Sequence, residues 1–318
     1  MNTCDVAIVG AGPAGLTAGL YASRGLVKTV VFEKQMAGGQ IATTDWVENY
    51  PAFPEGISGT DLGELMARQA QAFGAHIELF VTVTQISREA NGDFVLETDS
   101  GESWQAQAVI LASGAVPHKL GIPGEADYTG RGVSWCATCD GALYRDKVVA
   151  VIGGGDAAVE EALFLTKFAR KVYLVHRRDE FRATSVVAER AKAHEQIECV
   201  LSAVPVEIVG NGSKVTGLKV RSVVDGSEQL LEVDGVFEFV GIEPQNELAA
   251  GLVDAAVLEA GAGYLAVESN GSVAGISGLF VAGDLTLGPL KQAVTAAAGG
   301  ATAGFAALRY LESRDNAL

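Results

Sequence analysis

The chain has 318 residues, of which 48% are hydrophobic and 19% are charged, and this composition excludes a disordered or low-complexity protein. At about 150 residues per domain, the length predicts two domains, each large enough to bury a core. The 23 basic and 39 acidic side chains leave a net charge of −16, so we expect no nucleic acid among the partners, because binding it needs a basic face.

The N-terminal segment predicts a strand, a glycine turn, a helix and a second strand. Residues 6–9 form a short apolar run, the turn occupies residues 10–15, a helical stretch reaches about residue 24, and a second apolar run ends at Glu33. Such a βαβ unit can bind a dinucleotide, because the glycines allow a tight turn and close approach of a pyrophosphate, which the helix N-terminus stabilises. A lone turn of this kind is as often plain structure. The candidate cofactor residues are Gly10, Gly12, Pro13, Ala14 and Gly15, with Glu33 as an acceptor for ribose hydroxyls.

Two long uncharged runs have to be weighed as membrane or targeting segments. Residues 6–23 are interrupted by four glycines and a proline and lack a basic start, and residues 292–308 are rich in alanine and glycine and only weakly apolar. We therefore expect no membrane segment. Four cysteines are also too few for a disulfide scaffold, so we expect a cytoplasmic protein.

Further strands are predicted at residues 94–98 and 107–111, and the second leads into the candidate cofactor residues Ala112 and Gly114. We place crossovers between domains near residues 114–117 and 241–244. The predicted fold class is α/β, with two Rossmann-like dinucleotide-binding domains, the second inserted into the first. The expected boundaries are residues 1–115 and 245–318 for the split domain and 116–244 for the inserted one.

Cys136 and Cys139 are separated by two residues and can close a small disulfide ring or carry stabilised thiolates. A zinc site would need four ligands, and the sequence offers no second cysteine pair and no histidine pair, so we expect no metal. Cys4 and Cys199 are isolated and are expected to be buried small residues. A loose structural cysteine pair or a coincidence stays open. Asp140, directly after the pair, could hold a proton for a thiolate or be an ordinary turn aspartate.

A second βαβ unit repeats the first. Residues 148–152 predict a strand, a glycine turn follows, a helix reaches about residue 168, and a strand at residues 171–175 ends at His176. In both units, the residue that ends the second strand lies 23 positions after the first glycine. Two turns in the same register indicate dinucleotide binding much more strongly than one. The candidate cofactor residues of this turn are Gly153, Gly155, Asp156 and Ala157.

The two units differ where the second strand ends. In the position of Glu33 the second unit has a basic cluster, and guanidinium groups suit a phosphate dianion such as the 2′-phosphate of NADP. A solvated basic loop is the alternative, and Asp179 and Glu180 in the same segment weaken the preference for NADP over NAD. The cluster consists of His176, Arg177, Arg178 and Arg182.

The C-terminal part continues the pattern of the first domain. Strand-like segments at residues 215–220 and 233–240 are followed by a buried strand at residues 278–282, which leads to Asp284. A helix is expected to start at about Lys291.

These motifs, in this order, resemble those of the low-molecular-weight, bacterial-type thioredoxin reductases. The resemblance spans nearly the whole chain and is most specific at residues 136–141 and 176–182; it also includes both glycine turns and residues 38–40, 47–51 and 282–284. It implies an NADPH-dependent thioredoxin-disulfide reductase, a homodimer with FAD in the split domain and NADPH in the inserted domain. By this resemblance, electrons would pass from NADPH through FAD and the Cys136–Cys139 disulfide to thioredoxin.

The resemblance also implies roles for single residues. Cys139 would face the flavin, Cys136 would attack the partner's disulfide, and Asp140 would be the acid. The arginine cluster would hold the 2′-phosphate of NADPH, and the inserted domain would rotate about the two short crossovers. The residues that would line FAD are Glu33, Gly39, Gln40, Asn49, Asp284, Lys291, Gln292 and Ala293.

The chain departs from the family pattern at two places. Trp135 precedes Cys136 where a smaller residue or a tyrosine is more usual, and residues 298–301 replace a stretch that usually carries a polar residue beside the flavin. Three alternatives to a thioredoxin reductase remain: a related flavoenzyme acting on a small dithiol or disulfide, a peroxiredoxin reductase of the same flavoprotein family, and a non-catalytic FAD/NADP-binding redox sensor. The intact cysteine pair with Asp140 argues against the sensor, and the arginine cluster argues against an oxygen-using dithiol oxidase. A peroxiredoxin reductase of this family would carry an extra N-terminal region.

Overall fold

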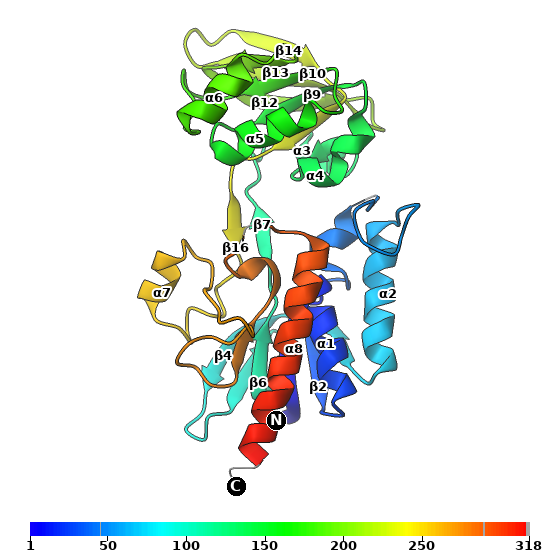
Figure 1. Ribbon diagram of the computed structural model, residues 1–318, viewed down its shortest axis with the longest axis vertical. Coiled ribbons are helices and arrows are strands. Elements are labelled where there is room, and N and C mark those ends of the chain that lie inside the picture. Colours follow the sequence, from blue (N-terminus) through cyan, green and yellow to red (C-terminus); the bar gives the residue numbers. More distant parts are fainter. Residues whose placement is uncertain (45, 289, 316–318) are drawn as a thin grey trace. The chain divides into compact units, whose positions relative to one another are not determined.

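The computed structural model describes residues 1–44, 46–288 and 290–315, and it divides into two compact units (Figure 1). The first unit comprises Met1–Val116 and Glu243–Leu318, and the second, Pro117–Ile242, is inserted into it. The chain crosses between them in β7 (Ala115–Pro117) and β16 (Ile242–Pro244), which pair with each other in a two-stranded sheet.

The first unit is built on a parallel sheet that carries an antiparallel extension. β1 lies between β2 and β6, β2 pairs with β3, and all of these pairs are parallel. β6 also pairs in parallel with β17 and antiparallel with β5, which pairs with β4. The strands are β1 (Asn2–Val9), β2 (Thr29–Glu33), β3 (His76–Leu79), β4 (Val83–Arg88), β5 (Phe94–Thr98), β6 (Ser103–Leu111) and β17 (Leu279–Val281).

Helices α1 and α8 cover one face of this sheet and lie side by side (Figure 1). Their contact is backbone to backbone: a Cβ at Gly300 would lie 2.0 Å from the carbonyl oxygen of Ala14, and one at Gly304 would lie 2.6 Å from that of Ala18. Glycine therefore allows the two helices to touch. The helical segments of this unit are α1 (Pro13–Arg24), η1 (Gly39–Thr43), α2 (Gly59–Ala72), α7 (Ala255–Ala260), η3 (Gly283–Leu285) and α8 (Ala293–Asp315).

The second unit combines a five-stranded sheet, in the order β11-β10-β9-β15-β8, with a three-stranded antiparallel sheet, β12-β13-β14. All strand pairs of the five-stranded sheet are parallel, and α5 and α6 pack on it through an apolar core. The strands are β8 (Val133–Ser134), β9 (Val148–Ile152), β10 (Lys171–Val175), β11 (Ile197–Val200), β12 (Ala203–Gly210), β13 (Val215–Ser222), β14 (Glu228–Glu232) and β15 (Gly235–Glu238). The helical segments are α3 (Glu125–Tyr128), α4 (Ala137–Asp140), η2 (Gly141–Tyr144), α5 (Asp156–Leu165) and α6 (Ser185–Lys192).

The predicted α/β class, with one Rossmann-like domain inserted into another, is confirmed. Several predicted element ends are wrong. α5 ends at Leu165 rather than near Phe168, where the hydroxyl of Thr166 donates to a carbonyl of the last turn. α8 starts at Ala293 rather than Lys291, because the backbone N–H of Gln292 donates to the Thr295 hydroxyl at 3.2 Å. The strand predicted at residues 233–240 is limited to Gly235–Glu238.

Candidate functional site

The first glycine turn joins β1 to α1, and backbone atoms lie close to two of its glycines. Gly10 has φ +103°, and a Cβ on it would lie 2.4 Å from the carbonyl oxygen of Ala112, at the end of β6. A Cβ on Gly15 would lie 1.8 Å from the carbonyl oxygen of Gly10. Gly12, by contrast, has no described atom closer than 3.9 Å to its Cβ position and gives α1 no side-chain cap. The N–H groups of the first turn are therefore left for an external anion.

Glu33 anchors this turn from the end of β2. Its Oε2 accepts the backbone N–H of Ala11 at 2.8 Å, and its Oε1 accepts that of Gln35 at 2.9 Å. Although the residue is 8% exposed, each carboxylate oxygen keeps a second lone pair that can accept a ligand hydroxyl. Glu33 therefore both fixes the turn and can bind a ribose.

The other residues expected at FAD follow the carboxyl ends of β2, β6 and β17 or precede α8. Gly39 lies against Gly12, and the Gln40 amide donates to the carbonyl oxygen of Ala115. The Asn49 amide donates to Oε1 of Gln292 at 3.1 Å across 243 positions of the chain. Ala112, Gly114 and Ala293 lie at the end of β6, just beyond it, and at the first residue of α8. The structure thus gathers the predicted residues of the first unit at one edge of its sheet.

Asp284 and Lys291 form a partly buried corner of this edge. Burial raises the pKa of Asp284, and burial lowers the pKa of Lys291, although the charge of Asp284 opposes the latter shift. Nζ of Lys291 donates to the carbonyl oxygens of Asp284 and Thr286, at 3.0 and 2.9 Å, and lies 4.2 Å from the ring centroid of Tyr264. Lys291 therefore holds the turn that carries Asp284.

The second glycine turn joins β9 to α5. Gly153 has φ +150°, and a Cβ there would lie 2.6 Å from the carbonyl oxygen of Phe239, whereas Gly155 has no described atom within 4 Å of its Cβ position. α5 also lacks a side-chain cap. Asp156 and Ala157 begin α5, and Oδ1 of Asp156 accepts the backbone N–H of Thr184 at 2.8 Å. As in the first turn, the open space at the glycine and the free N–H groups of the helix N-terminus are available to a ligand.

The arginine cluster lies against this turn. The backbone N–H groups of Arg182 and Ala183 both donate to the carbonyl oxygen of Gly154, at 2.6 and 3.1 Å. Arg177, Arg178 and Arg182 are exposed, and none of them makes an ion pair with the described residues. Three unpaired guanidinium groups beside a glycine turn can bind a phosphate.

His176 differs from its arginine neighbours. It is 6% exposed, its ring stacks on Phe181, and it occupies the space where a Gly154 Cβ would be. Burial lowers its pKa, as do the nearby charges of Arg178, Arg182 and Arg177. His176 is therefore a neutral support beneath the turn rather than a cationic member of the cluster.

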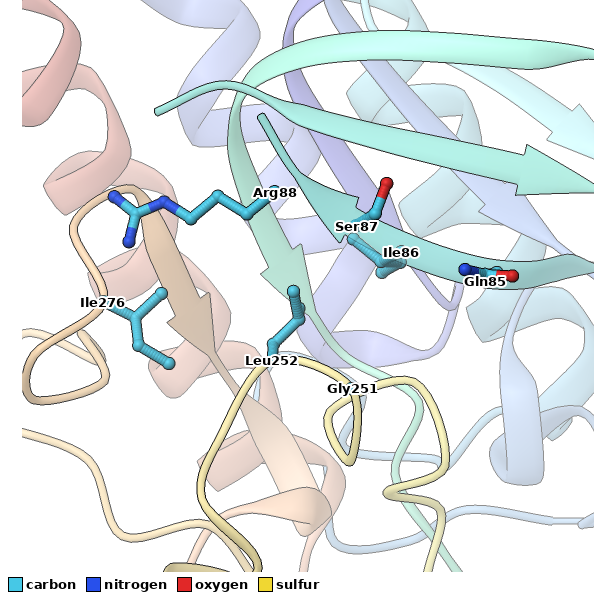
Figure 2. Close-up of a pocket in the computed structure, with 7 residues that line it drawn as sticks. All are labelled: Gln85, Ile86, Ser87, Arg88, Gly251, Leu252 and Ile276. Carbon is cyan, nitrogen blue, oxygen red and sulfur yellow. The ribbon is translucent and has the colours of Figure 1, made fainter. Parts of the chain in front are cut away.

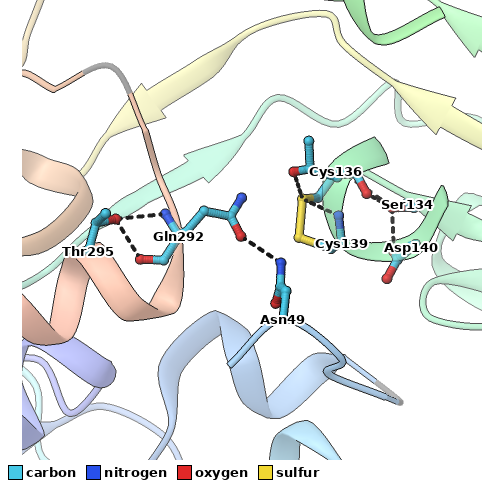
Figure 3. The surroundings of a disulfide bond; sticks show 8 residues. Asn49, Ser134, Cys136, Cys139, Asp140, Gln292 and Thr295 are labelled. Atoms are coloured by element: carbon cyan, nitrogen blue, oxygen red, sulfur yellow. Dashed lines mark hydrogen bonds between the residues drawn. A yellow bond between two sulfur atoms is a disulfide. The ribbon is translucent and has the colours of Figure 1, made fainter. Parts of the chain in front are cut away.

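Figure 3 shows the disulfide that joins Cys136 and Cys139, with Cα atoms 5.3 Å apart. Cys136 precedes α4, and its Sγ accepts the backbone N–H of Cys139 at 3.1 Å and contacts the Thr138 hydroxyl at 3.3 Å. Both cysteines are partly exposed. The two cysteines thus form a disulfide at the N-terminus of α4, in the same unit as the second glycine turn, and are not a coincidental pair.

Asp140 is connected through Ser134 to the disulfide loop, by which we mean residues 134–140. Oδ2 of Asp140 accepts the Ser134 hydroxyl at 2.5 Å, and the same hydroxyl accepts the backbone N–H of Cys136 at 3.1 Å. Burial, together with the charges of Asp140 and Asp234, raises the pKa of Tyr144, so its phenol is neutral. No sequence motif singles out Ser134; its only signal is a hydroxyl two residues before the first cysteine of the pair.

Glu238, at the end of β15, is a second group that no sequence motif predicts. It is 2% exposed, and its Oε2 accepts the indole N–H of Trp135 at 3.1 Å. Its Oε1 has no hydrogen-bond partner among the described residues. The available signal was one carboxyl group inside the apolar stretch of residues 235–240.

A cavity of about 470 Å³ lies elsewhere in the first unit (Figure 2). It is lined by Gln85, Ile86, Ser87, Arg88, Gly251, Leu252 and Ile276, and none of these is a predicted site residue. Arg88 donates to the carbonyl oxygen of Ser277 at 3.2 Å and packs on Phe94, so its guanidinium group already has partners within the protein.

Among the described residues, no group of three or more His, Cys, Asp or Glu side chains is placed to hold a metal ion. No helix in residues 1–44, 46–288 and 290–315 is long and apolar enough to cross a membrane.

Comparisons with known proteins agree with this geometry. The family model of the pyridine nucleotide-disulphide oxidoreductases matches residues 4–300. A thioredoxin reductase from Mycolicibacterium smegmatis is 46% identical over 98% of this chain and 97% of its own. A bifunctional thioredoxin reductase/thioredoxin from Mycobacterium leprae is 44% identical over 96% of this chain and 66% of its own. The crystal structure of thioredoxin reductase from Streptococcus pyogenes is similar, with a TM-score of 0.89 and 38% identity over 98% of this chain and 99% of that one.

Proposed function

Because the chain belongs to the pyridine nucleotide-disulphide oxidoreductases and, within them, to the thioredoxin reductases, we propose that it passes electrons from NADPH to the disulfide of thioredoxin. The observation that carries the proposal is the Cys136–Cys139 disulfide, in a unit that also has a glycine turn and three unpaired arginines. The fused thioredoxin in the Mycobacterium leprae relative supports thioredoxin as the partner.

The residues present fit the two cofactors, FAD and NADPH. The fit rests on two uncapped helix N-termini and on the open space at Gly12 and Gly155, where a side chain would obstruct a pyrophosphate. FAD would be held by the first turn with Glu33 and Asp284, and NADPH by the second turn with Arg177, Arg178 and Arg182. Once bound, the two cofactors supply the two electrons that reduce the Cys136–Cys139 disulfide.

The chain's own residues then carry out the thiol–disulfide exchange. The thiolate of Cys136 attacks one sulfur of the substrate disulfide, and the other sulfur leaves and takes a proton from Asp140. Cys139 next attacks Sγ of Cys136, which releases the second substrate sulfur and restores the enzyme disulfide. The two thiol protons of the enzyme end on the substrate, so Asp140 has to lose and regain a proton in each cycle.

Anaerobic titration tests the proposal. We expect the purified protein to bind FAD, NADPH to bleach the visible flavin absorbance, and oxidised thioredoxin to restore it. In Cys136→Ser, NADPH should still bleach the flavin, but thioredoxin should not be reduced. Failure of NADPH to bleach bound flavin would reject the proposal. Restoration by a small disulfide but not by thioredoxins would favour the small-disulfide alternative.

A homodimer and a cytoplasmic location also belong to the proposal. An apolar face of the first unit supports the homodimer: α1, α2 and α8 surround a cavity of about 350 Å³ whose lining includes Tyr21, Tyr50, Phe53, Leu65, Met66 and Ala298. Tyr21, Leu65 and Phe305 on the same helices are 38%, 44% and 52% exposed. A second copy of the chain would cover these side chains.

A further inference from the structure

Ser134, the last residue of β8, lies between the disulfide loop and the carboxyl group of Asp140 (Figure 3). Its hydroxyl donates to Oδ2 of Asp140 at 2.5 Å and accepts from the backbone N–H of Cys136 at 3.1 Å. The residue is 5% exposed, so water competes little for these bonds. Among the hydroxyl groups of this loop, that of Ser134 joins the proton donor to the backbone of the attacking cysteine.

The hydroxyl can serve Asp140 in both of its protonation states. A serine hydroxyl has one donor and two acceptor positions. With Asp140 ionised, the hydroxyl donates to the carboxylate, as observed. With Asp140 protonated, the carboxyl group can donate to Ser134 Oγ, and the hydroxyl can turn to the carbonyl oxygen of Cys136, 3.4 Å away. The backbone N–H of Cys136 keeps its acceptor in either case, so proton loss and gain need only rotation of one hydroxyl.

We propose that Ser134 is a positioning residue for proton transfer by Asp140, holding its carboxyl group against the Cys136 backbone before and after the proton moves. The inference rests on the function proposed above, in which Asp140 protonates the leaving sulfur. Ser134 does not touch the reacting sulfur atoms and acts only through Asp140.

A choice of substrate separates this role from a merely structural one. Thioredoxin's leaving sulfur is a basic thiolate that needs a proton, whereas 5,5′-dithiobis(2-nitrobenzoate) releases an acidic aromatic thiolate that leaves without one. Loss of Ser134 function should therefore slow the reduction of thioredoxin and spare that of the aromatic disulfide. A loosened disulfide loop would slow both alike.

Ser134→Ala is the test, assayed with NADPH against both substrates. We expect kcat with thioredoxin to fall about tenfold, the size of one lost hydrogen bond to a charged group, and the rate with the aromatic disulfide to change less than about twofold. The alkaline limb of the thioredoxin pH profile should move to higher pH, because the hydroxyl bonds the ionised carboxylate more strongly than the neutral carboxyl group. Ser134→Thr, which keeps the hydroxyl, should restore both rate and profile.

Two matched variants complete the design. Thr166→Ala removes another hydroxyl of the same unit, which donates to the carbonyl oxygen of Leu163 at 2.7 Å. This variant should reduce both substrates at the parent's rates. In an Asp140→Asn background, Ser134→Ala should add no further loss, because both changes act on the same proton transfer. If Ser134→Ala does not retain flavin, Ser134→Cys replaces it, since a thiol of similar shape is only a weak donor.

An equal loss with both substrates, or a thioredoxin rate equal to that of Thr166→Ala, overturns the positioning role while the proposed function stands. A parent enzyme that reduces neither disulfide overturns the proposed function and this inference with it.

Discussion

At the residue scale, Glu238 is a carboxyl group in an environment that opposes its ionisation. Burial is the largest cause that raises its pKa to about 8, and the charge of Glu125 adds to it, while the Trp135 indole N–H and Lys119 act in the other direction. Both oxygens of Glu125 already accept backbone N–H groups, from Leu120 and Gly121. Glu238 therefore holds its proton at neutral pH.

This raised pKa makes stability depend on pH. The folded chain binds the Glu238 proton more tightly than the unfolded chain, so the free energy of unfolding should fall as the pH rises from about 4.5 to about 8 and then level off. The slope contributed by this group is at most about 1.4 kcal/mol per pH unit. Glu238→Gln keeps an acceptor for Trp135 without a titrating proton. The advantage of Glu238→Gln over the parent in urea unfolding should be small at pH 5 and grow to a few kcal/mol at pH 8. A difference that is constant across this range would contradict the assignment.

The arginine cluster predicts that the protein prefers NADPH to NADH. Changing Arg177 and Arg178 together to alanine removes two exposed guanidinium groups that would meet the 2′-phosphate of NADPH. We expect KM for NADPH to rise at least about tenfold, KM for NADH to stay nearly constant, and flavin reduction at saturating NADPH to change little. Arg221→Ala, an exposed arginine on β13, is the control. Unchanged use of NADPH by the double variant would make the cluster an ordinary solvated loop.

At the element scale, the contact between α1 and α8 depends on two glycines of α8, one of them inside the stretch at residues 298–301. The stretch at residues 298–301 contains Gly300, and the structure shows that its hydrogen-only side chain is what lets α8 reach the backbone of Ala14. Gly304 repeats this contact one turn later against Ala18. Because Ala14 belongs to the first glycine turn, this packing supports the predicted FAD site from behind.

Alanine substitutions can separate packing from helix propensity. Gly300→Ala places a Cβ 2.0 Å from a backbone oxygen, so we expect a loss of about 1–3 kcal/mol in unfolding free energy, with weaker retention of FAD. In Gly299→Ala the nearest described atom outside the helix backbone is 3.5 Å away, an ordinary contact, so this neighbour should be neutral or gain up to about 1 kcal/mol from helix propensity. Chemical unfolding of both variants gives the answer. Equal stability of the two would show that the helices adjust freely.

The sequence predicted best those elements whose local pattern is self-sufficient. β2, β9 and β10 match their predicted ranges, because each has a centre of buried apolar residues next to a glycine turn or a charged residue. Contacts between distant segments have no local sequence pattern and could not be predicted. The hydrogen bond between Asn49 and Gln292 joins residues 243 positions apart, and that between Trp135 and Glu238 joins residues 103 positions apart. The pairing of β7 with β16 belongs to the same class.

At the scale of the whole molecule, the two glycine turns in equal register made the inserted architecture predictable, since each turn needs its own parallel sheet. The same reasoning does not extend to association between copies. Exposed apolar side chains become visible as one face only when α1, α2 and α8 are placed side by side.

Leu65→Asp tests whether this face joins two copies. Leu65 lies on α2 and is 44% exposed in the single chain, so a carboxylate there would be solvated in a monomer but desolvated without a partner in a dimer. We expect the parent to sediment as a dimer and the variant to dissociate at least about a hundredfold more readily. Leu230→Asp, on β14 of the inserted unit and 52% exposed, adds the same charge away from the face and should stay dimeric. A monomeric parent would refute the homodimer, whereas a Leu65→Asp variant as dimeric as the parent would place the interface elsewhere.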